Sequence, residues 1–228
     1  MKKYELTTET LQFAGRTLHR IKAVKDFGSI KAGEFGGYIE NEKNLSQDDN
    51  AWIYGEAMAI GNARVFGNAK ILGNAHIFGN AKVFDSARVY DDAIVHNNAR
   101  IYDNAIVYDN AIVSDYAEVC ENAKVCDDAD VYGLTRIFGN AKIFGNATIK
   151  GNAKVHDDID YIVFKNFWSS GRYFTWTRSN NKWSVGCFYG TGKELIKKAY
   201  ADSVKSGREY ERVVRYVESI LADEKEKK

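Results

Sequence analysis

Histidine is the side chain best suited to catalysis near neutral pH, and this sequence has four histidines, at His19, His76, His96 and His156. A histidine can act as a general base toward a hydroxyl or an amine, and three histidines can hold a catalytic zinc ion. The repeat described below puts His76 and His96 on one face in successive coils, while His156 falls on another face. One coil step and two strand residues place His76 and His96 roughly 8 Å apart, which is too far for one metal ion. Both are candidates for a general base, and no metal site is predicted.

The remaining reactive side chains do not form a recognisable catalytic site. Cys120, Cys126 and Cys187 are an odd set with no close pair, which fits a reducing compartment rather than a disulfide framework. The glycine-containing segment at residues 190–193 is too short for a phosphate-binding loop. The sequence shows no Ser/His/Asp or Cys/His arrangement and no set of metal ligands at a typical spacing, and no cofactor is expected.

A repeat positions these residues, because alanine recurs every sixth residue from Ala51 to Ala153 with Thr135 as the single exception. Each hexad reads Ala-x-(Ile/Val)-(aromatic)-(Gly/Asp)-(Asn/Asp), as at residues 63–68. A helix would scatter a period of six around its circumference, whereas a short strand and a tight turn return each residue type to the same side. The repeat therefore predicts a β-solenoid with the alanine and the aliphatic residue inside.

An aliphatic residue with a small residue four places later, repeated every six, resembles the hexapeptide signature of the left-handed parallel β-helix family. The resemblance implies three hexads per triangular coil and a left-handed coil. The eighteen hexads then give six coils, about 29 Å long at a strand separation of about 4.8 Å. Residues 36–39 (Gly-Gly-Tyr-Ile) and 186–190 (Gly-Cys-Phe-Tyr-Gly) are similar to an uncharacterised subgroup, common in phages and prophages and often labelled as transferases.

The period of eighteen assigns every outward residue to one of three faces. The first basic face carries Trp52, Tyr54, Lys70, Leu72, Arg88, Tyr90, Ile106, Tyr108, Lys124, Cys126, Lys142 and Phe144. The second basic face carries Arg64, Phe66, Lys82, Phe84, Arg100, Tyr102, Glu118, Cys120, Arg136, Phe138, Lys154 and His156. The uncharged face carries Met58, Ile60, His76, Phe78, Ile94, His96, Ile112 and Ser114, and then Asp130, Tyr132, Thr148 and Lys150. Large apolar patches mark contacts, so we expect the uncharged face to be buried against another subunit or the C-terminal domain.

The basic faces have two interpretations. Lysine and arginine stems can simply pack along stacked rings, or rings and cations together can bind an anionic partner. Acidic columns at the corners weaken the second interpretation, so nucleic acid is not favoured. The columns, which are expected to be solvated or to bind a cation, are Asp91, Asp109 and Asp127, and Asp85, Asp103 and Glu121. Asparagine at the second turn position is expected to supply a left-handed backbone conformation.

Changes of pattern divide the chain into three segments. Residues 1–50 are expected to form an N-terminal β cap, because an uncovered first coil would expose unpaired backbone and apolar interior. Residues 51–158 form the repeat, and residues 159–228 a small α+β domain of three strands and two helices. The strand-like runs are 161–164, 172–177 and 182–187. Thr191 or Gly192 can cap the first helix, and the second helix is expected to start near Gly207.

The C-terminal domain also concentrates aromatic and arginine side chains, of the kinds enriched at binding hot spots. These side chains are Trp168, Arg172, Trp176, Arg178 and Trp183. A small sheet backed by helices needs aromatic residues for its core too, so binding and core packing both remain open for this cluster.

The composition excludes several classes of protein. Lysine and arginine total 32 against 31 aspartate and glutamate, so no global charge indicates a nucleic-acid or membrane partner. The N-terminus lacks the apolar stretch of a signal peptide, and no run approaches the roughly 20 apolar residues of a membrane span. We therefore expect a cytoplasmic location, which is the host cytoplasm if the chain is phage-encoded.

Taken together, the sequence favours a non-catalytic β-helix scaffold that forms a homo-oligomer and binds a host protein or a small nucleotide-like ligand, with counter-defence as a use suggested by the phage resemblance. Family relatives with known chemistry are mostly acyltransferases that use coenzyme A, typically with a loop that interrupts the hexads. The repeat here is uninterrupted, so an acyltransferase with His76 or His96 as base is the alternative. The expected binding residues are Met58, Ile60, Phe78, Ile94, Ile112, Arg172, Trp176 and Arg178.

Overall fold

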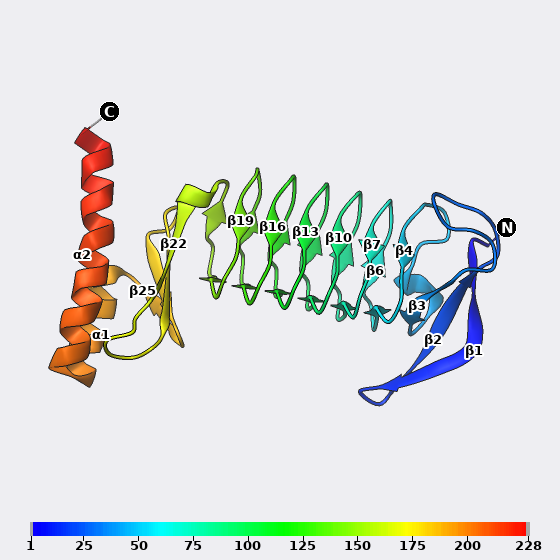
Figure 1. Cartoon of the computed structure of the whole chain (residues 1–228), viewed down its shortest axis with the longest axis horizontal. Coiled ribbons are helices and arrows are strands. Elements are labelled where there is room, and N and C mark those ends of the chain that lie inside the picture. Colours follow the sequence, from blue (N-terminus) through cyan, green and yellow to red (C-terminus); the bar gives the residue numbers. More distant parts are fainter. Residues whose placement is uncertain (1, 227–228) are drawn as a thin grey trace. The chain divides into compact units, whose positions relative to one another are not determined.

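The structure is a computed structural model that describes the backbone of residues 2–226 and the side chains of residues 2–224. The chain divides into two compact units, one ending at Asp158 and one beginning at Ile159. The first unit is almost entirely β-structure, and the second combines a small sheet with two helices (Figure 1).

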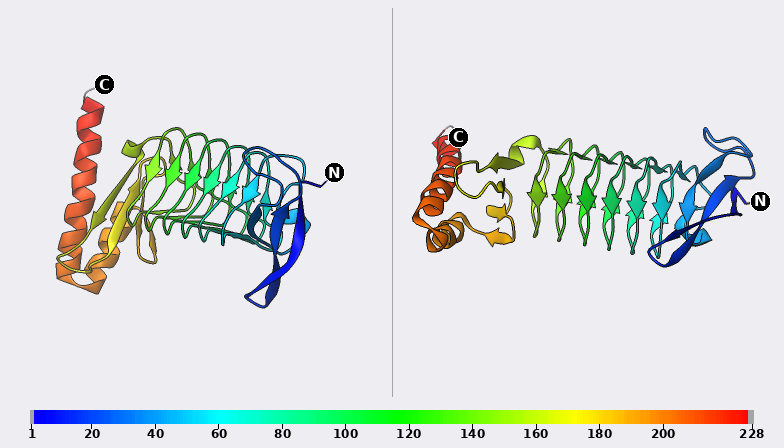
Figure 2. Two further views of the ribbon diagram at one scale, coloured as in Figure 1. Left: turned by 45° about the vertical axis from the view of Figure 1, so that its right-hand side comes forward. Right: turned by 60° about the horizontal axis from the view of Figure 1, so that its bottom comes forward.

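The solenoid consists of eighteen two-residue strands whose coils stack along one axis (Figure 2). The first basic face is built from β4 (Trp52–Ile53), β7 (Lys70–Ile71), β10 (Arg88–Val89), β13 (Ile106–Val107), β16 (Lys124–Val125) and β19 (Lys142–Ile143). The second basic face is built from β6 (Arg64–Val65), β9 (Lys82–Val83), β12 (Arg100–Ile101), β15 (Glu118–Val119), β18 (Arg136–Ile137) and β21 (Lys154–Val155). The uncharged face is built from β5 (Met58–Ala59), β8 (His76–Ile77), β11 (Ile94–Val95), β14 (Ile112–Val113), β17 (Asp130–Val131) and β20 (Thr148–Ile149).

The predicted solenoid with an eighteen-residue coil is confirmed by the strand pairing, in which Ile94 lies beside Ile112 in a parallel register. The inward alanine and aliphatic side chains are at most 1% exposed, so they form a continuous apolar interior. Backbone hydrogen bonds join successive coils; for example, the Ile94 N–H donates to the Ala111 carbonyl at 2.9 Å. The left hand of the coil stays an expectation from the family resemblance.

Thr135 is the one hexad position where a polar side chain replaces the inward alanine. Its side chain is 1% exposed, and its hydroxyl has no hydrogen-bond partner among the described residues. An unsatisfied buried hydroxyl costs about 1–3 kcal/mol, so this coil carries a local cost that the others avoid.

An additional coil precedes the alanine repeat, so the solenoid has about seven turns rather than the six predicted. Strand β3 (Phe35–Ile39) pairs in parallel with β5, and Leu45 bridges to Val65. The coil has no alanine hexad, which is why the repeat did not reveal it. It packs so tightly that a β-carbon on Gly37 would lie 2.3 Å from the Ala57 carbonyl oxygen.

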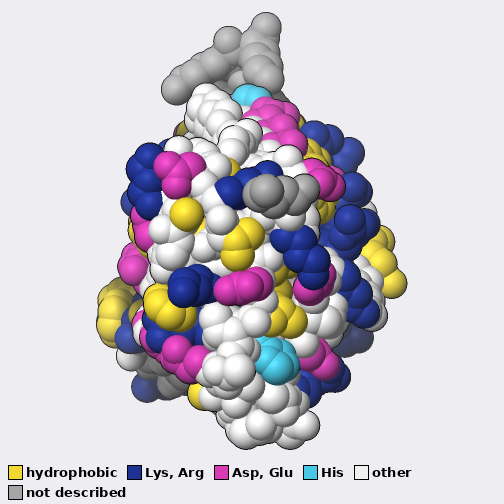
Figure 3. All heavy atoms as spheres, turned by 90° about the vertical axis from the view of Figure 1, so that its right-hand side faces the viewer, with side chains coloured by type: hydrophobic (Ala, Val, Ile, Leu, Met, Phe, Trp, Pro, Cys, Tyr) yellow, Lys and Arg dark blue, Asp and Glu magenta, His cyan; other side chains and the backbone are white. Residues whose placement is uncertain are grey.

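A long antiparallel hairpin, β1 (Tyr4–Phe13) and β2 (Arg16–Ala23), extends the sheet of the uncharged face through β3. A short 3-10 helix, η1 (Glu42–Asn44), follows β3 and is capped by the Asn41 side chain. Seen from this N-terminal end, hydrophobic side chains lie in small groups between charged ones (Figure 3). Leu18 and Ile21 of β2 are fully buried, so the hairpin covers apolar side chains at the start of the solenoid.

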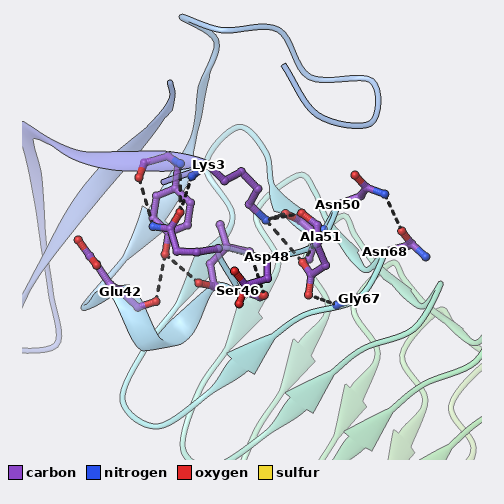
Figure 4. Close-up of polar contacts among 12 residues, drawn as sticks. Lys3, Glu42, Ser46, Asp48, Asn50, Ala51, Gly67 and Asn68 are labelled. Atoms are coloured by element: carbon purple, nitrogen blue, oxygen red, sulfur yellow. Dashed lines mark hydrogen bonds and ion pairs between the residues drawn. The ribbon is translucent and has the colours of Figure 1, made fainter. Parts of the chain in front are cut away.

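Lys3 fastens the start of β1 to the first regular coil (Figure 4). Its side chain is only 1% exposed, and its ammonium donates to the carbonyls of Asp49 at 3.0 Å and Ala51 at 2.9 Å. The Asp49 carboxylate lies 3.5 Å away, and the ammonium also faces the Phe27 ring. Burial lowers the pKa of Lys3 to about 8, because the surroundings only partly replace water around the charge.

The sharp reversal at each solenoid corner lies at the first turn position. The backbone angle φ is 73° at Gly67 and 56° at both Asp91 and Asp109, all in the left-handed region. Within residues 2–226, the asparagines at the second turn position, such as Asn68, do not have a positive φ. The expectation that the asparagine column supplies the left-handed conformation is therefore wrong, because the chain turns one residue earlier.

The asparagine column instead forms ladders of side-chain hydrogen bonds. The Asn62 amide donates to the Asn80 side-chain oxygen at 3.2 Å, and the Asn80 amide donates to Asn98 at 3.1 Å. The Asn80 side-chain oxygen thus accepts from the preceding coil, and its side-chain nitrogen donates to the following coil. The column holds adjacent corners in register.

The acidic columns have a role that neither sequence interpretation included. The Asp109 carboxylate accepts from the Asp127 N–H at 3.2 Å, and the Asp127 carboxylate accepts from the Gly145 N–H at 2.8 Å. In the other column, Asp103 accepts from the Glu121 N–H at 3.0 Å. These carboxylates satisfy backbone donors in the next coil, which offsets the repulsion between stacked charges.

The second unit contains a four-stranded antiparallel sheet and two helices. In sheet order the strands are β22 (Tyr161–Lys165), β23 (Tyr173–Thr177), β24 (Lys182–Val185) and β25 (Phe188–Gly190). The helices are α1 (Gly192–Asp202) and α2 (Val204–Glu226), and the 3-10 turn η2 (Asp158–Asp160) precedes β22. The core of this unit contains Phe174, Trp176, Trp183, Val185, Leu195, Ala199, Tyr210, Val214 and Val217.

Two details of the second unit differ from the sequence expectation. Three strands were predicted, but β25 adds a fourth, because Gly186 turns the chain with a φ of 54° within the run that was assigned to one strand. Helix α2 begins at Val204 rather than near Gly207, and Gly207 instead packs under the Tyr200 ring. The expected cap at Thr191 is confirmed by a reciprocal capping box with Glu194.

The buried Lys3 gives a prediction for the pH dependence of stability. Between pH 8 and the ordinary value of 10.5, the unfolded chain retains a proton that the folded chain releases, so the free energy of unfolding rises with pH in this window. The Lys3→Met variant lacks this proton. Between pH 8 and pH 9.5, the free energy of unfolding measured by urea denaturation is expected to rise by about 1–2 kcal/mol more for the native protein than for the variant. Lys2→Met, at an exposed position, is the matched control and should behave as the native protein. If the free energy of unfolding changed with pH equally for the native and Lys3→Met proteins, the burial of a titrating lysine would be contradicted.

Candidate functional site

The N-terminal hairpin covers the first part of the uncharged face. Met58 is 6% exposed and Ile60 is 5% exposed, and both pack with Leu18 and Tyr38. The surrounding side chains are Leu11 and Phe13 from β1 and Phe78 from the solenoid. The cover that we expected from a second subunit or the C-terminal domain is provided here by the chain's own hairpin.

Beyond this cluster the uncharged face remains accessible. Ile94 and Ile112 are half-buried and directly adjacent in the parallel register, while Ser114 is buried. Two aliphatic side chains side by side on an outward face are unusual in this solenoid, where most outward positions of the other faces carry a cation or an aromatic ring. The pair Ile94 and Ile112 is called the isoleucine patch below.

His76 and His96 lie in separate ring contacts. The Phe13 and His76 rings meet in a T-shaped contact with centroids 5.2 Å apart, and burial lowers the pKa of His76. His96 stacks on Phe78 at 4.8 Å, with the two planes 9° apart. In the strand register His76 faces Ile94 rather than His96, so the structure does not join the two histidines in one site.

The other two histidines are equally separate from this face. The His19 ring nitrogen lies 3.4 Å from the Thr7 carbonyl oxygen in the hairpin. His156 contacts the Asp157 carboxylate at 2.5 Å and the Phe138 ring at the end of the solenoid. No pair of these histidines is brought together among the described residues.

A carboxyl group lies on the same face as the isoleucine patch. Asp130 follows Ile112 in the register, and burial raises its pKa, an effect that nearby His96 and Lys150 partly oppose. Asp130, with His96 and Lys150 nearby, therefore forms a polar group one coil beyond the isoleucine patch. This polar group marks the end of the apolar surface.

The arginine and tryptophan residues chosen from the C-terminal sequence occupy different environments. Trp176 is 1% exposed within the core, and its indole N–H donates to the Asn181 side chain at 2.9 Å. Arg178 donates two hydrogen bonds to the Glu224 carboxylate at 2.6 and 3.1 Å. Arg172 is exposed on the segment that leads into β23. The three side chains do not converge on one surface.

A hollow of about 400 Å³ does lie in this unit, between the end of β22, the segment that follows it, and α2. It is lined by Phe164, Lys165, Asn166, Trp168, Glu209, Arg212, Val213 and Tyr216. Only Trp168 was singled out from the sequence. The α2 residues were missed because the helix pattern showed the apolar stripe but not which exposed residues meet the sheet.

Three potential metal ligands also lie close together in the solenoid. Ligand atoms of Asp109, Cys126 and Asp127 lie within 4.8 Å of one another. Both carboxylates already accept backbone hydrogen bonds, as described above, and the buried Cys126 thiol hydrogen-bonds with Tyr108. The three side chains therefore already have structural partners at the corner of the solenoid.

Comparison with known proteins agrees with the fold. The YdcK beta solenoid repeat family matches residues 99–115. The uncharacterized acetyltransferase YdcK of Escherichia coli (strain K12) is 36% identical over 64 residues, which cover 25% of this chain. The match spans only 20% of that relative's length. The repeat, the parallel sheets and these similarities fit a hexapeptide-repeat β-helix protein. No described helix is both long and apolar enough to cross a membrane.

The contact between Phe13 and His76 can be tested by titration. Because the fold favours neutral His76, acidification through the ordinary value of 6.5 is expected to lower the free energy of unfolding. The Phe13→Ala variant should raise the pKa of His76 toward 6.5 and cost about 1–2 kcal/mol of stability. Proton NMR titration of the His76 ring and urea denaturation measure the two effects.

A half-buried ring on another face supplies the control for that experiment. Phe84→Ala removes a stacked ring from the second basic face and should leave the His76 titration unchanged. An ordinary His76 pKa in the native protein would contradict the covering role of the hairpin.

Proposed function

We propose that this chain is a non-catalytic β-helix scaffold that forms a homo-oligomer through the isoleucine patch and uses its C-terminal unit to bind a partner. The observation that carries the proposal is the pair of accessible isoleucines, Ile94 and Ile112, directly beyond the part of the uncharged face that the hairpin covers. A second copy placed there would add to the apolar packing that Met58, Ile60 and Phe78 form beneath the hairpin.

The regular solenoid supports a scaffold rather than an enzyme. Its eighteen short strands follow one another without an inserted loop, and an enzyme of this family typically uses such a loop to cover its substrate. The two candidate bases, His76 and His96, each pack against an aromatic ring. A general base must instead face the proton that it removes.

The cellular role is proposed from the resemblance to phage and prophage proteins. A phage-derived scaffold in the host cytoplasm could counter host defence by binding a host protein or a small nucleotide-like ligand. The charged and aromatic surface of the second unit is compatible with such a ligand.

An acyltransferase is the second candidate function, favoured by the local similarity to a protein named as an acetyltransferase. In that case coenzyme A would bind along the solenoid with His76 or His96 as base. Calorimetric titration with coenzyme A decides between the two. Absence of coenzyme A binding at millimolar concentration would exclude the acyltransferase function. Saturable binding that is lost in His96→Gln would favour that function.

The assembly proposal predicts that a charge on the isoleucine patch dissociates the oligomer. Ile94→Glu and Ile112→Glu should each shift the molar mass measured by light scattering to that of one chain, because a buried unpaired carboxylate is costly. Circular dichroism should show the native β-structure in both variants.

The matched control uses the same substitution elsewhere on the solenoid. Ile106→Glu places a carboxylate at an equivalent outward strand position of the first basic face. It should leave the molar mass unchanged. The proposal fails if the native chain is already a monomer, or if all three variants give the same mass.

A further inference from the structure

The hollow in the second unit has the dimensions of a small-molecule site. Its volume of about 400 Å³ falls within the range of roughly 300–1,000 Å³ that is usual for ligand pockets. Phe164 comes from β22, Trp168 from the following segment, and Arg212 and Tyr216 from α2. Elements far apart in the sequence therefore meet to form one concavity.

The rings of the hollow are unusually accessible. Trp168 is 69% exposed and Tyr216 is 55% exposed, and the Tyr216 and Phe164 rings meet in a T-shaped contact with centroids 5.9 Å apart. The other three tryptophans of the sequence, Trp52, Trp176 and Trp183, are at most 2% exposed. Exposed rings around a hollow provide flat surfaces on which another ring can stack.

A buried amide fixes the position of Trp168. Asn166 is 3% exposed, and its side-chain oxygen accepts from the backbone N–H groups of Trp168 and Ser169, both at 3.1 Å. Its amide nitrogen donates to the Ser169 hydroxyl at 2.8 Å. The exposed indole is therefore carried on a segment held by hydrogen bonds, which reduces the entropy cost of binding.

Cations predominate around the hollow and the depression beside it. The depression is lined by Arg208, Glu211, Arg212, Arg215, Tyr216 and Ser219, so it shares Arg212 and Tyr216 with the hollow. Together the two surfaces carry Lys165, Arg208, Arg212 and Arg215 against Glu209 and Glu211. Arg212 pairs with Glu209 at 2.7 Å, whereas Arg208 has no ion pair among the described residues.

The combination of rings and arginines selects among ligand classes. A bare inorganic anion would use the arginines but not the rings, and an organic cation would be repelled by the excess of positive charge. A planar heteroaromatic ring that carries phosphate uses both, because it can stack on Trp168 and Tyr216 while its phosphates reach Arg208 and Arg212.

We propose that the hollow between β22 and α2 binds a free nucleoside phosphate, with its base stacked on Trp168 and Tyr216 and its phosphates on Arg208 and Arg212. The inference rests on the proposed binding role of the C-terminal unit, but not on assembly through the isoleucine patch. It identifies a site distinct from Arg172, Trp176 and Arg178.

Intrinsic fluorescence provides a direct test with the full chain. Because Trp168 is the exposed tryptophan, titration with ADP should quench its emission and protect it from iodide. Adenosine alone and pyrophosphate alone should each bind at least tenfold more weakly than ADP, since each makes only part of the contacts. Calorimetry on the same samples gives the affinity independently of fluorescence.

Variants of the lining residues test the contacts. Arg212→Gln and Tyr216→Leu should each weaken ADP binding about tenfold or more, whereas Lys197→Gln and Tyr116→Leu, at exposed positions outside the hollow, should not. Circular dichroism checks that each variant is folded. Trp168→Phe should remove the fluorescence change while calorimetry still detects ADP.

Three results would overturn the assignment. These are an ADP affinity no better than that of pyrophosphate, affinity unchanged in Arg212→Gln and Tyr216→Leu, and much tighter binding of a five-nucleotide single-stranded RNA than of ADP. The last result would assign the site to nucleic acid. Light scattering on the same samples keeps assembly separate, since loss of oligomerisation with intact ADP binding contradicts only the scaffold proposal.

Discussion

The structure of the first unit depends on one backbone constraint, a left-handed residue at the first turn position of each hexad from Gly55 to Gly151. That residue reverses the chain after a two-residue strand, so three hexads close a coil and backbone N–H groups along the strands donate to carbonyls in the next coil. Glycine, aspartate and asparagine meet this requirement most easily, and they occupy nearly all of these positions. The alanine interior, the three faces and the two kinds of side-chain ladder follow from this turn.

The periodic part of the fold was predictable because a repeated physical requirement leaves a repeated residue type. The alanine spacing gave the strands, the register and the inward positions correctly. The coil around β3 was missed because it has no inward alanine. Gly36 and Gly37 instead allow the backbone to pack closely against the next coil. The hairpin cover was also missed, because the sequence showed that Met58 and Ile60 need cover but not that Leu11 and Phe13 supply it. That pairing is set by tertiary geometry.

The candidate site was less predictable than the fold. Trp168, Trp176 and Trp183 lie within sixteen residues, and composition alone treats them alike. The sheet separates them, since Trp176 and Trp183 point into the core and Trp168 lies outside it. Arg212 and Tyr216 of the hollow lie more than forty residues further along, on a helix. No local pattern could have joined them to Trp168.

The directional ladders at the corners have a consequence for the length of the solenoid. Corner carboxylates such as Asp109 and Asp127 bond to the coil after them, and Asn80 bonds to the coils on both sides, so neighbouring coils are joined by the same kinds of contact. A coil of eighteen residues could therefore be inserted or removed without rotating the faces. The length of the first unit would then change by about 4.8 Å for each coil, while its three faces keep the same orientation.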